Sequence, residues 1–115
     1  MSFWKGKTVL ITGHTGFKGS WLSLYLKEIG AQVFGYALEP RPMSLFNIAK
    51  LDGELESHFG DIRNFSVLEN YIKKIQPEII FHLAAQSLVG VSYQKPLETV
   101  EVNILGSSNL LIAAK

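Results

Sequence analysis

Three glycines at regular spacing, Gly13, Gly16 and Gly19, constrain this chain more than any other feature. They follow the apolar, β-branched run 8–12, which is typical of a strand buried on both faces, and they precede a segment with helical periodicity. In such a strand–turn–helix unit the first glycine allows the tight turn, the second lets backbone amides approach a diphosphate, and the third lets the helix pack close to the strand. The spacing therefore predicts a diphosphate site at the start of a helix.

These glycines allow two other interpretations. A plain strand-to-helix turn remains open, whereas a P-loop is excluded, because its spacing from Gly13 requires glycine at position 18 and lysine at position 19. The chain has Lys18 and Gly19 there. A cation in the first turn opposes the helix dipole, so Lys18 is either a solvated side chain or a partner of a bound anion.

Strand and helix patterns alternate along the chain. Strands are predicted at 8–12, 32–37, 57–60 and 79–83, and helices at 17–29, 44–51, 66–76 and from Pro96 onward. Ser66 and Glu69 have the spacing of a capping box, and Gly30 is placed as a left-handed cap. This order predicts an α/β fold with a parallel sheet and helices on both faces.

Each long helix is expected to bury one apolar face. In the first helix that face holds Trp21, Leu22, Tyr25, Leu26 and Ile29. In the last helix it holds Val100, Ile104 and Leu111.

The composition excludes several classes of function. A net charge of +1 provides no electrostatic attraction to nucleic acid or anionic lipid, and without cysteine there is no disulfide or thiolate zinc site. His14 and His58 are interpreted as loop residues and His82 as a core residue, so no metal site is predicted. No apolar run is long enough to span a bilayer, and the first residues lack the apolar region of a signal peptide. We expect a cytoplasmic protein.

The second strand bears on the choice between NAD and NADP. Dinucleotide-binding folds that use NAD often end this strand with an acid that binds the ribose hydroxyls. Here the strand ends with apolar residues, Glu39 lies two residues further on, and Arg41 stands between two prolines. NAD is the expected cofactor, and NADP is not excluded.

Four segments together carry a family resemblance. They are the glycine turn 13–19, GDIR at 60–63, FHLAAQ at 81–86 and VNILG at 102–106. In this order they resemble the extended short-chain dehydrogenase/reductases, the NAD-dependent epimerases and dehydratases. In the branch of this family that acts on CDP-glucose, members have similar sequences at residues 3–7, 12–22, 35–38, 57–63 and 92–96. The resemblance implies a Rossmann-type sheet of which this chain holds strands 1 to 4.

The resemblance also implies a cofactor site. Around the diphosphate would lie Gly13, Thr15, Gly16, Phe17, Lys18 and Gly19, and around the adenine Asp61 and Ile62. Beside the nicotinamide ribose would lie Leu83, Ala84, Ala85 and Gln86, and near the active site Asn103. Taken alone, Asp61 after Gly60 is equally typical of a turn, and Asn103 of a polar interruption within a helix.

The implied activity is that of a lyase that converts CDP-glucose to CDP-4-keto-6-deoxyglucose. Family members use a tyrosine followed four residues later by lysine, and none of the four tyrosines here has lysine at that spacing. We therefore expect one NAD(P)-binding domain, residues 1–115, truncated within its last helix, inactive alone and able to form a homodimer. The fourth strand is expected to present an unpaired apolar edge. Alternatives are another nucleotide-sugar epimerase or dehydratase, or a noncatalytic dinucleotide-binding module; a flavodoxin-like domain fits the first loop poorly.

Overall fold

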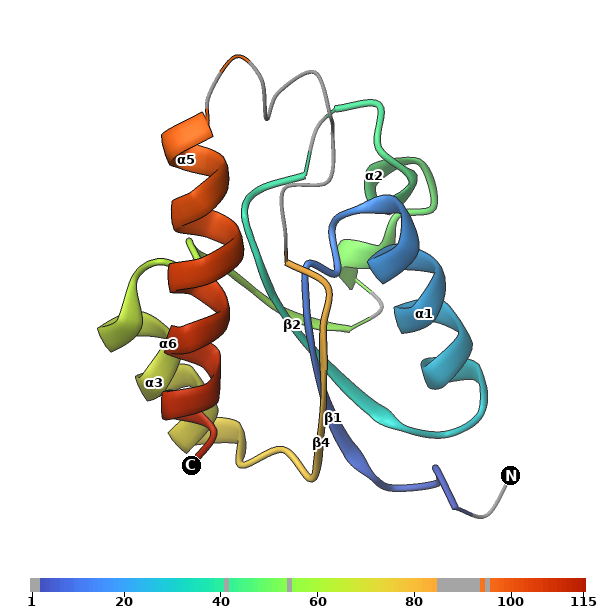
Figure 1. The fold of residues 1–115 in the computed structure, drawn as a ribbon. Helices are drawn as coiled ribbons and strands as arrows, with labels where there is room; N and C mark the ends of the chain where they lie inside the picture. Colours follow the sequence, from blue (N-terminus) through green and yellow to red (C-terminus); the bar gives the residue numbers. More distant parts are fainter. Residues whose placement is uncertain (1–2, 41, 54, 85–93, 95) are drawn as a thin grey trace.

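The computed structural model describes residues 3–40, 42–53, 55–84, 94 and 96–115. Its centre is a four-stranded parallel sheet in the order β3-β2-β1-β4 (Figure 1). The strands are β1 Thr8–Thr12, β2 Gln32–Ala37, β3 Glu56–Phe59 and β4 Ile79–His82. In the described part of the chain β4 pairs with β1 alone and forms one edge of the sheet. The predicted Rossmann-type α/β fold is confirmed.

Helices cover both faces of the sheet. They are α1 Phe17–Glu28, α2 Leu45–Ile48, α3 Phe65–Ile75, α5 Pro96–Val100 and α6 Gly106–Ala113, with a 3₁₀ turn at Leu51–Gly53 and a π-helical segment at Glu101–Leu105. In Figure 1, α1 and α2 lie on one side of the sheet and α3 and α6 lie on the other. None of the helices in the described ranges has the length and apolar character that a bilayer-spanning helix needs.

The core is divided by the sheet into two apolar clusters. Leu10 points into the cluster that contains Leu68 and Leu110 of α3 and α6. Its neighbours Val9 and Ile11 point into the cluster on the α1 side. Consecutive side chains of a strand point to opposite faces, so a strand covered on both sides must be apolar throughout, as β1 is.

The buried face of α1 matches the predicted one in part. Leu26 is buried and Leu22 and Ile29 pack against the same apolar cluster, whereas Trp21 and Tyr25 are exposed. Small residues are also buried at the start of the helix, at Gly19, Ser20 and Ser23. There α1 packs so closely on the turn that a Cβ on Gly19 would overlap the Gly13 carbonyl.

The predicted capping box of α3 is wrong by two residues. The helix begins at Phe65, and the Asn64 side chain accepts a hydrogen bond from the Val67 amide at 3.3 Å. Ser66 therefore lies inside the first turn, where its hydroxyl does not cap the helix. At the other end Gln76 has a left-handed backbone with a φ of 45°.

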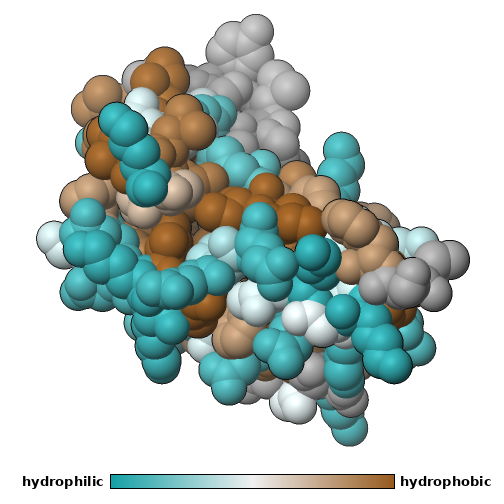
Figure 2. Space-filling view, turned by 90° about the horizontal axis from the view of Figure 1, so that it is seen from below, coloured by the Kyte–Doolittle hydropathy of each residue, from teal (hydrophilic) through white to brown (hydrophobic). Residues whose placement is uncertain are grey.

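The last helical stretch, which comprises α5, the π-helical segment and α6, also departs from the predicted pattern. Ile104 and Leu111 are exposed, Val100 is not described at the side-chain level, and Gly106, Asn109 and Leu110 are buried. A π-helical segment adds a residue to its turn, which rotates everything after it by about 100° relative to an uninterrupted α-helix. On the left side of Figure 2, where α3 and α6 lie, hydrophobic residues reach the surface among hydrophilic ones.

Candidate functional site

The glycine turn joins the carboxyl ends of three strands. Gly13 follows β1 with a φ of 81°, and its amide donates to the Tyr36 carbonyl of β2 at 2.9 Å. A Cβ on Gly13 would lie 2.6 Å from the carbonyl carbon of Leu83, which follows β4. Only glycine combines this left-handed backbone with so close a contact. The turn is therefore held against both neighbours of β1.

The amino end of α1 is free of side-chain caps. Its N-cap residue is Gly16, no side chain accepts from its first amides, and no acidic residue lies in its first turn. The first amides of an α-helix have no partner within the helix, and they carry a partial positive charge. Lys18 adds a full positive charge and is exposed. This helix end is suited to an anion.

A cavity of about 630 Å³ opens beside this helix end. Its lining combines the glycine turn, the segments that follow β2 and β3, the end of β4 and the last helical stretch; the members are Gly13, Thr15, Gly16, Phe17, Ala37, Leu38, Glu39, Pro40, Ser44, Leu45, Gly60, Asp61, Ile62, Arg63, Leu83, Ala84, Glu98 and Val102. Open α/β sheets bind their ligands at this edge, beyond the carboxyl ends of the strands.

Most of the residues expected to bind a cofactor meet at this cavity. Those in its lining are Gly13, Thr15, Gly16, Phe17, Asp61, Ile62, Leu83 and Ala84. Gly19 lies beneath the turn against Gly13, whereas Lys18 and Asn103 are described outside the lining. Ala85 and Gln86 lie outside the described residues.

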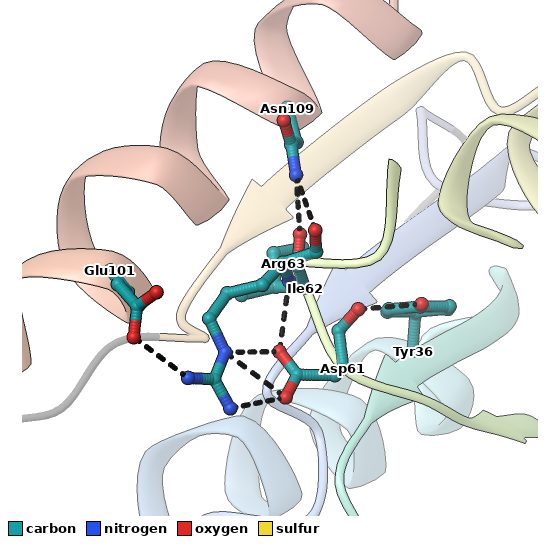
Figure 3. Close-up of polar contacts among 6 residues, drawn as sticks. All are labelled: Tyr36, Asp61, Ile62, Arg63, Glu101 and Asn109. Atoms are coloured by element: carbon teal, nitrogen blue, oxygen red, sulfur yellow. Dashed lines mark hydrogen bonds and ion pairs between the residues drawn. The ribbon is translucent and has the colours of Figure 1, made fainter. Parts of the chain in front are cut away.

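Asp61 is bound by Arg63, a residue to which the sequence assigned no role. The Arg63 guanidinium binds both Asp61 oxygens, with Nη2 donating to Oδ2 at 2.6 Å and Nε to Oδ1 at 3.0 Å (Figure 3). The Arg63 amide also donates to Oδ1 at 2.9 Å. Hydrogen bonds from Arg63 hold the pKa of the Asp61 carboxyl below its usual range. Asp61 is therefore an ionised acceptor, and an adenine amine would share it with Arg63.

Arg63 also connects this loop to the last helical stretch. Its Nη1 lies 3.5 Å from Oε1 of Glu101, and this contact is drawn in Figure 3. Asn109 of α6 donates to the carbonyls of Ile62 and Arg63 at 3.2 and 3.0 Å. The Tyr36 hydroxyl donates to the Asp61 carbonyl at 2.9 Å. Three hydrogen bonds from distant side chains thus hold the 61–63 backbone. The GDIR pattern was the only signal in the sequence that pointed to Arg63.

His14 is a core residue, contrary to the loop position expected from the sequence. Its side chain is 0% exposed, and its Nε2 lies 2.8 Å from Ser57 Oγ on β3. The ring packs over Gly35 of β2, where a Cβ would overlap it. Burial lowers the pKa of His14 to about 4. His14 therefore anchors the glycine turn to β2 and β3 as a neutral side chain.

Of the other two histidines, His58 lies on β3 rather than in a loop, and His82 is placed as predicted. His58 stacks on the Tyr36 ring at 5.5 Å, with an angle of 4° between the ring planes. His82 contacts hydrogen-bonding side chains through both ring nitrogens, as expected for a satisfied core histidine. No group of three histidine, aspartate or glutamate side chains suited to a metal comes together in the described ranges.

Comparisons with known proteins give three kinds of match. The family model for GDP-mannose 4,6 dehydratase matches residues 10–115. CDP-glucose 4,6-dehydratase of Salmonella typhimurium is 56% identical over 99% of this chain and 32% of its own length. The chain thus spans about a third of that relative.

Solved structures share the fold. An epimerase of Methanothermobacter thermautotrophicus superposes with a TM-score of 0.82 at 34% identity, over 97% of this chain and 32% of its own. UDP-glucose 4-epimerase of Thermus thermophilus, solved as a complex with NAD, gives a TM-score of 0.77 at 30% identity, over 91% of this chain and 32% of its own.

Proposed function

Because the chain belongs to the GDP-mannose 4,6 dehydratase family, we propose that it forms the NAD-binding part of a nucleotide-sugar 4,6-dehydratase that acts on CDP-glucose. The 56% identical relative supports this substrate, and the Thermus thermophilus complex supports NAD as the cofactor. Since the chain spans about a third of that relative, the activity is proposed for the whole protein. A homodimer and a cytoplasmic location stay predictions.

One observation carries the proposal: an uncapped helix end without acidic residues borders a cavity at the carboxyl ends of parallel strands. In this proposal the diphosphate lies against the amides of residues 13–17, with Lys18 as a counter-charge and Gly19 allowing the helix to approach. Such a helix end stabilises an anion through its unpaired N–H groups and its dipole.

The rest of the dinucleotide is assigned along the same cavity. Asp61 and Ile62 receive the adenine, with the ionised carboxylate as acceptor and the buried Ile62 forming the apolar surface under the base. Leu83 and Ala84, followed by Ala85 and Gln86, are assigned to the nicotinamide ribose. Asn103 is assigned to the active-site end of the last helical stretch.

Glu39 supports NAD over NADP. Glu39 belongs to the cavity lining where the chain leaves β2. A carboxylate there accepts hydrogen bonds from ribose hydroxyls and repels the extra phosphate of NADP. Arg63, the basic residue of the described lining, is already paired with Asp61 and Glu101.

In this proposal the residues of this chain bind NAD and orient it. When bound, NAD would supply the hydride acceptor for oxidation of the sugar and the hydride donor that completes the elimination. The glycine turn holds the diphosphate and the 61–63 loop holds the adenine, which lowers the entropic cost of bringing the reactive ring to the sugar. The tyrosine–lysine pair of the family is absent from these 115 residues.

Amide chemical-shift mapping tests the NAD site. Titrating NAD into the ¹⁵N-labelled chain is expected to shift the amides of residues 13–17 and 61–63 together. NADP, which adds a phosphate, is expected to shift them less at equal concentration, and FMN serves as a flavin control. Saturating NAD with no shifts at these amides, or with shifts confined to other surfaces, contradicts the proposal.

The substrate requires the whole protein. Purified full-length enzyme is expected to convert CDP-glucose to a 4-keto-6-deoxy sugar nucleotide faster than GDP-mannose, which the family model names. Preference for GDP-mannose would keep the NAD site and overturn the assignment of CDP-glucose.

A further inference from the structure

His82, the last residue of β4, connects the sheet to the last helical stretch through both ring nitrogens. Its Nδ1 lies 2.6 Å from Oγ1 of Thr12, the last residue of β1. Its Nε2 lies 2.9 Å from Oγ of Ser107 on α6. Thr12 is 0% exposed, so its hydroxyl has no access to water and depends on protein partners.

The contact with Ser107 determines which ring nitrogen of His82 carries the proton. The Ser107 hydroxyl donates its single hydrogen to the Asn103 carbonyl at 2.7 Å. Toward His82 this oxygen can only accept. Nε2 must therefore be the protonated nitrogen of the ring.

The contact with Thr12 leads independently to the same tautomer. Thr12 Oγ1 accepts hydrogen bonds from the Leu83 amide at 3.1 Å and the Ala84 amide at 3.3 Å. Its own hydrogen is then left to donate to His82 Nδ1, which must be an unprotonated acceptor. The two contacts agree on one neutral form of the imidazole. Burial also lowers the pKa of His82, which favours this neutral form.

The Thr12 hydroxyl holds part of the cavity wall. Leu83 and Ala84 belong to the cavity lining, and a Cβ on Gly13 would lie 2.6 to 2.7 Å from the peptide that joins them. The separation between the glycine turn and the chain after β4 therefore depends on where these two amides are held. The Leu83 amide is shared between the Thr12 carbonyl at 2.9 Å and the Thr12 hydroxyl, whereas the Ala84 amide donates to the hydroxyl. This hydroxyl is oriented by His82.

We propose that His82 is a positioning residue of the dinucleotide site: as the neutral Nε2–H tautomer it orients the Thr12 hydroxyl, which sets the Leu83–Ala84 backbone against the glycine turn. The inference rests on the proposed NAD-binding function. In this inference the contact between Nδ1 and Thr12 orients the hydroxyl, and the contact between Nε2 and Ser107 selects the tautomer.

Two carboxamide variants separate the two contacts. In His82→Asn the side-chain oxygen replaces Nδ1 as the acceptor for Thr12, and in His82→Gln the side-chain amide replaces Nε2–H as the donor to Ser107. We expect His82→Asn to keep the Ala84 amide protected from hydrogen exchange and to keep NAD affinity within about twofold. We expect His82→Gln to speed that exchange and to weaken NAD binding by about tenfold.

A second pair tests the same contact from the other side. Thr12→Ser keeps the hydroxyl and is expected to retain exchange protection and affinity, whereas Thr12→Val keeps the shape of the side chain but removes the hydroxyl and is expected to behave as His82→Gln. This pair decides the matter if either His82 variant fails to fold.

The tautomer is read from the imidazole ¹⁵N shifts without any dinucleotide. A protonated Nε2 and unprotonated Nδ1 near neutral pH are expected, and the opposite tautomer overturns the inference. Equal Ala84 exchange and equal NAD affinity in the Asn and Gln variants, and in the Ser and Val variants, also overturn it. Failure of the unsubstituted chain to bind NAD contradicts the proposed function, and this inference with it, whatever the tautomer.

Discussion

We expect acid to destabilise the fold through His14, because this imidazole is buried as a neutral group. The side chain is 0% exposed, and its Nδ1 has no hydrogen-bond partner in the described structure. Around it lie Ser57, the Phe46 ring at 5.3 Å and the Phe59 ring at 6.3 Å. Protonation would place a charge and a second N–H among groups that offer that N–H no acceptor.

The size of the effect follows from the two pKa values. Burial lowers the pKa of His14 from 6.5 to about 4. Above pH 6.5 the imidazole is neutral in both states and contributes no pH dependence. As the pH falls below 6.5, the imidazole is protonated in the unfolded chain but stays neutral in the folded chain. The free energy of unfolding therefore falls until the pH reaches the pKa of the folded state. The expected loss is about 2 kcal/mol between pH 7 and pH 5, and about 3 kcal/mol in full.

Urea unfolding followed by circular dichroism at about pH 7 and pH 5 measures this loss. The control is His14→Gln, which keeps a polar group near Ser57 but does not titrate. Because the pKa of His82 is also lowered, the difference between the two proteins isolates His14. Equal losses in both proteins would refute the reasoning. So would an NMR titration of the His14 ring with a midpoint near 6.5, a readout that does not depend on the variant folding.

Two substitutions test local features. Gly13→Ala is expected to lower the free energy of unfolding by several kcal/mol and to abolish NAD binding, because its Cβ would lie 2.6 Å from the Leu83 carbonyl carbon at a φ of 81°; a thermal midpoint equal to that of the unsubstituted chain would contradict this. Asn64→Ala is expected to cost about 1 kcal/mol through loss of the cap on Val67, whereas Ser66→Ala should cost almost nothing, and the reverse order in urea unfolding would restore the predicted capping box.

The parts of this protein that depend on local backbone requirements were determined by the sequence alone. The spacing of Gly13, Gly16 and Gly19 between an apolar strand and a helix predicted the unit that borders the cavity. The parallel sheet followed from the alternation of strand and helix patterns, whereas the order of strands within it came only from the structure. The resemblance then pointed to Asp61 and Ile62, which line the same cavity. Turn geometry and strand periodicity are properties of a few consecutive residues, so they can be recognised before the chain is folded.

Contacts between distant segments were decided only by the tertiary structure. His14 is buried because Ser57, 43 residues away, and Gly35 leave a space for its ring. The start of α1 carries small buried residues because Gly19 packs directly on Gly13, whereas Trp21 and Tyr25 of the predicted apolar face are exposed. Periodicity shows that a helix has an apolar face, but which face is buried depends on the volume left by neighbouring elements, and that volume is absent from any single stretch of sequence.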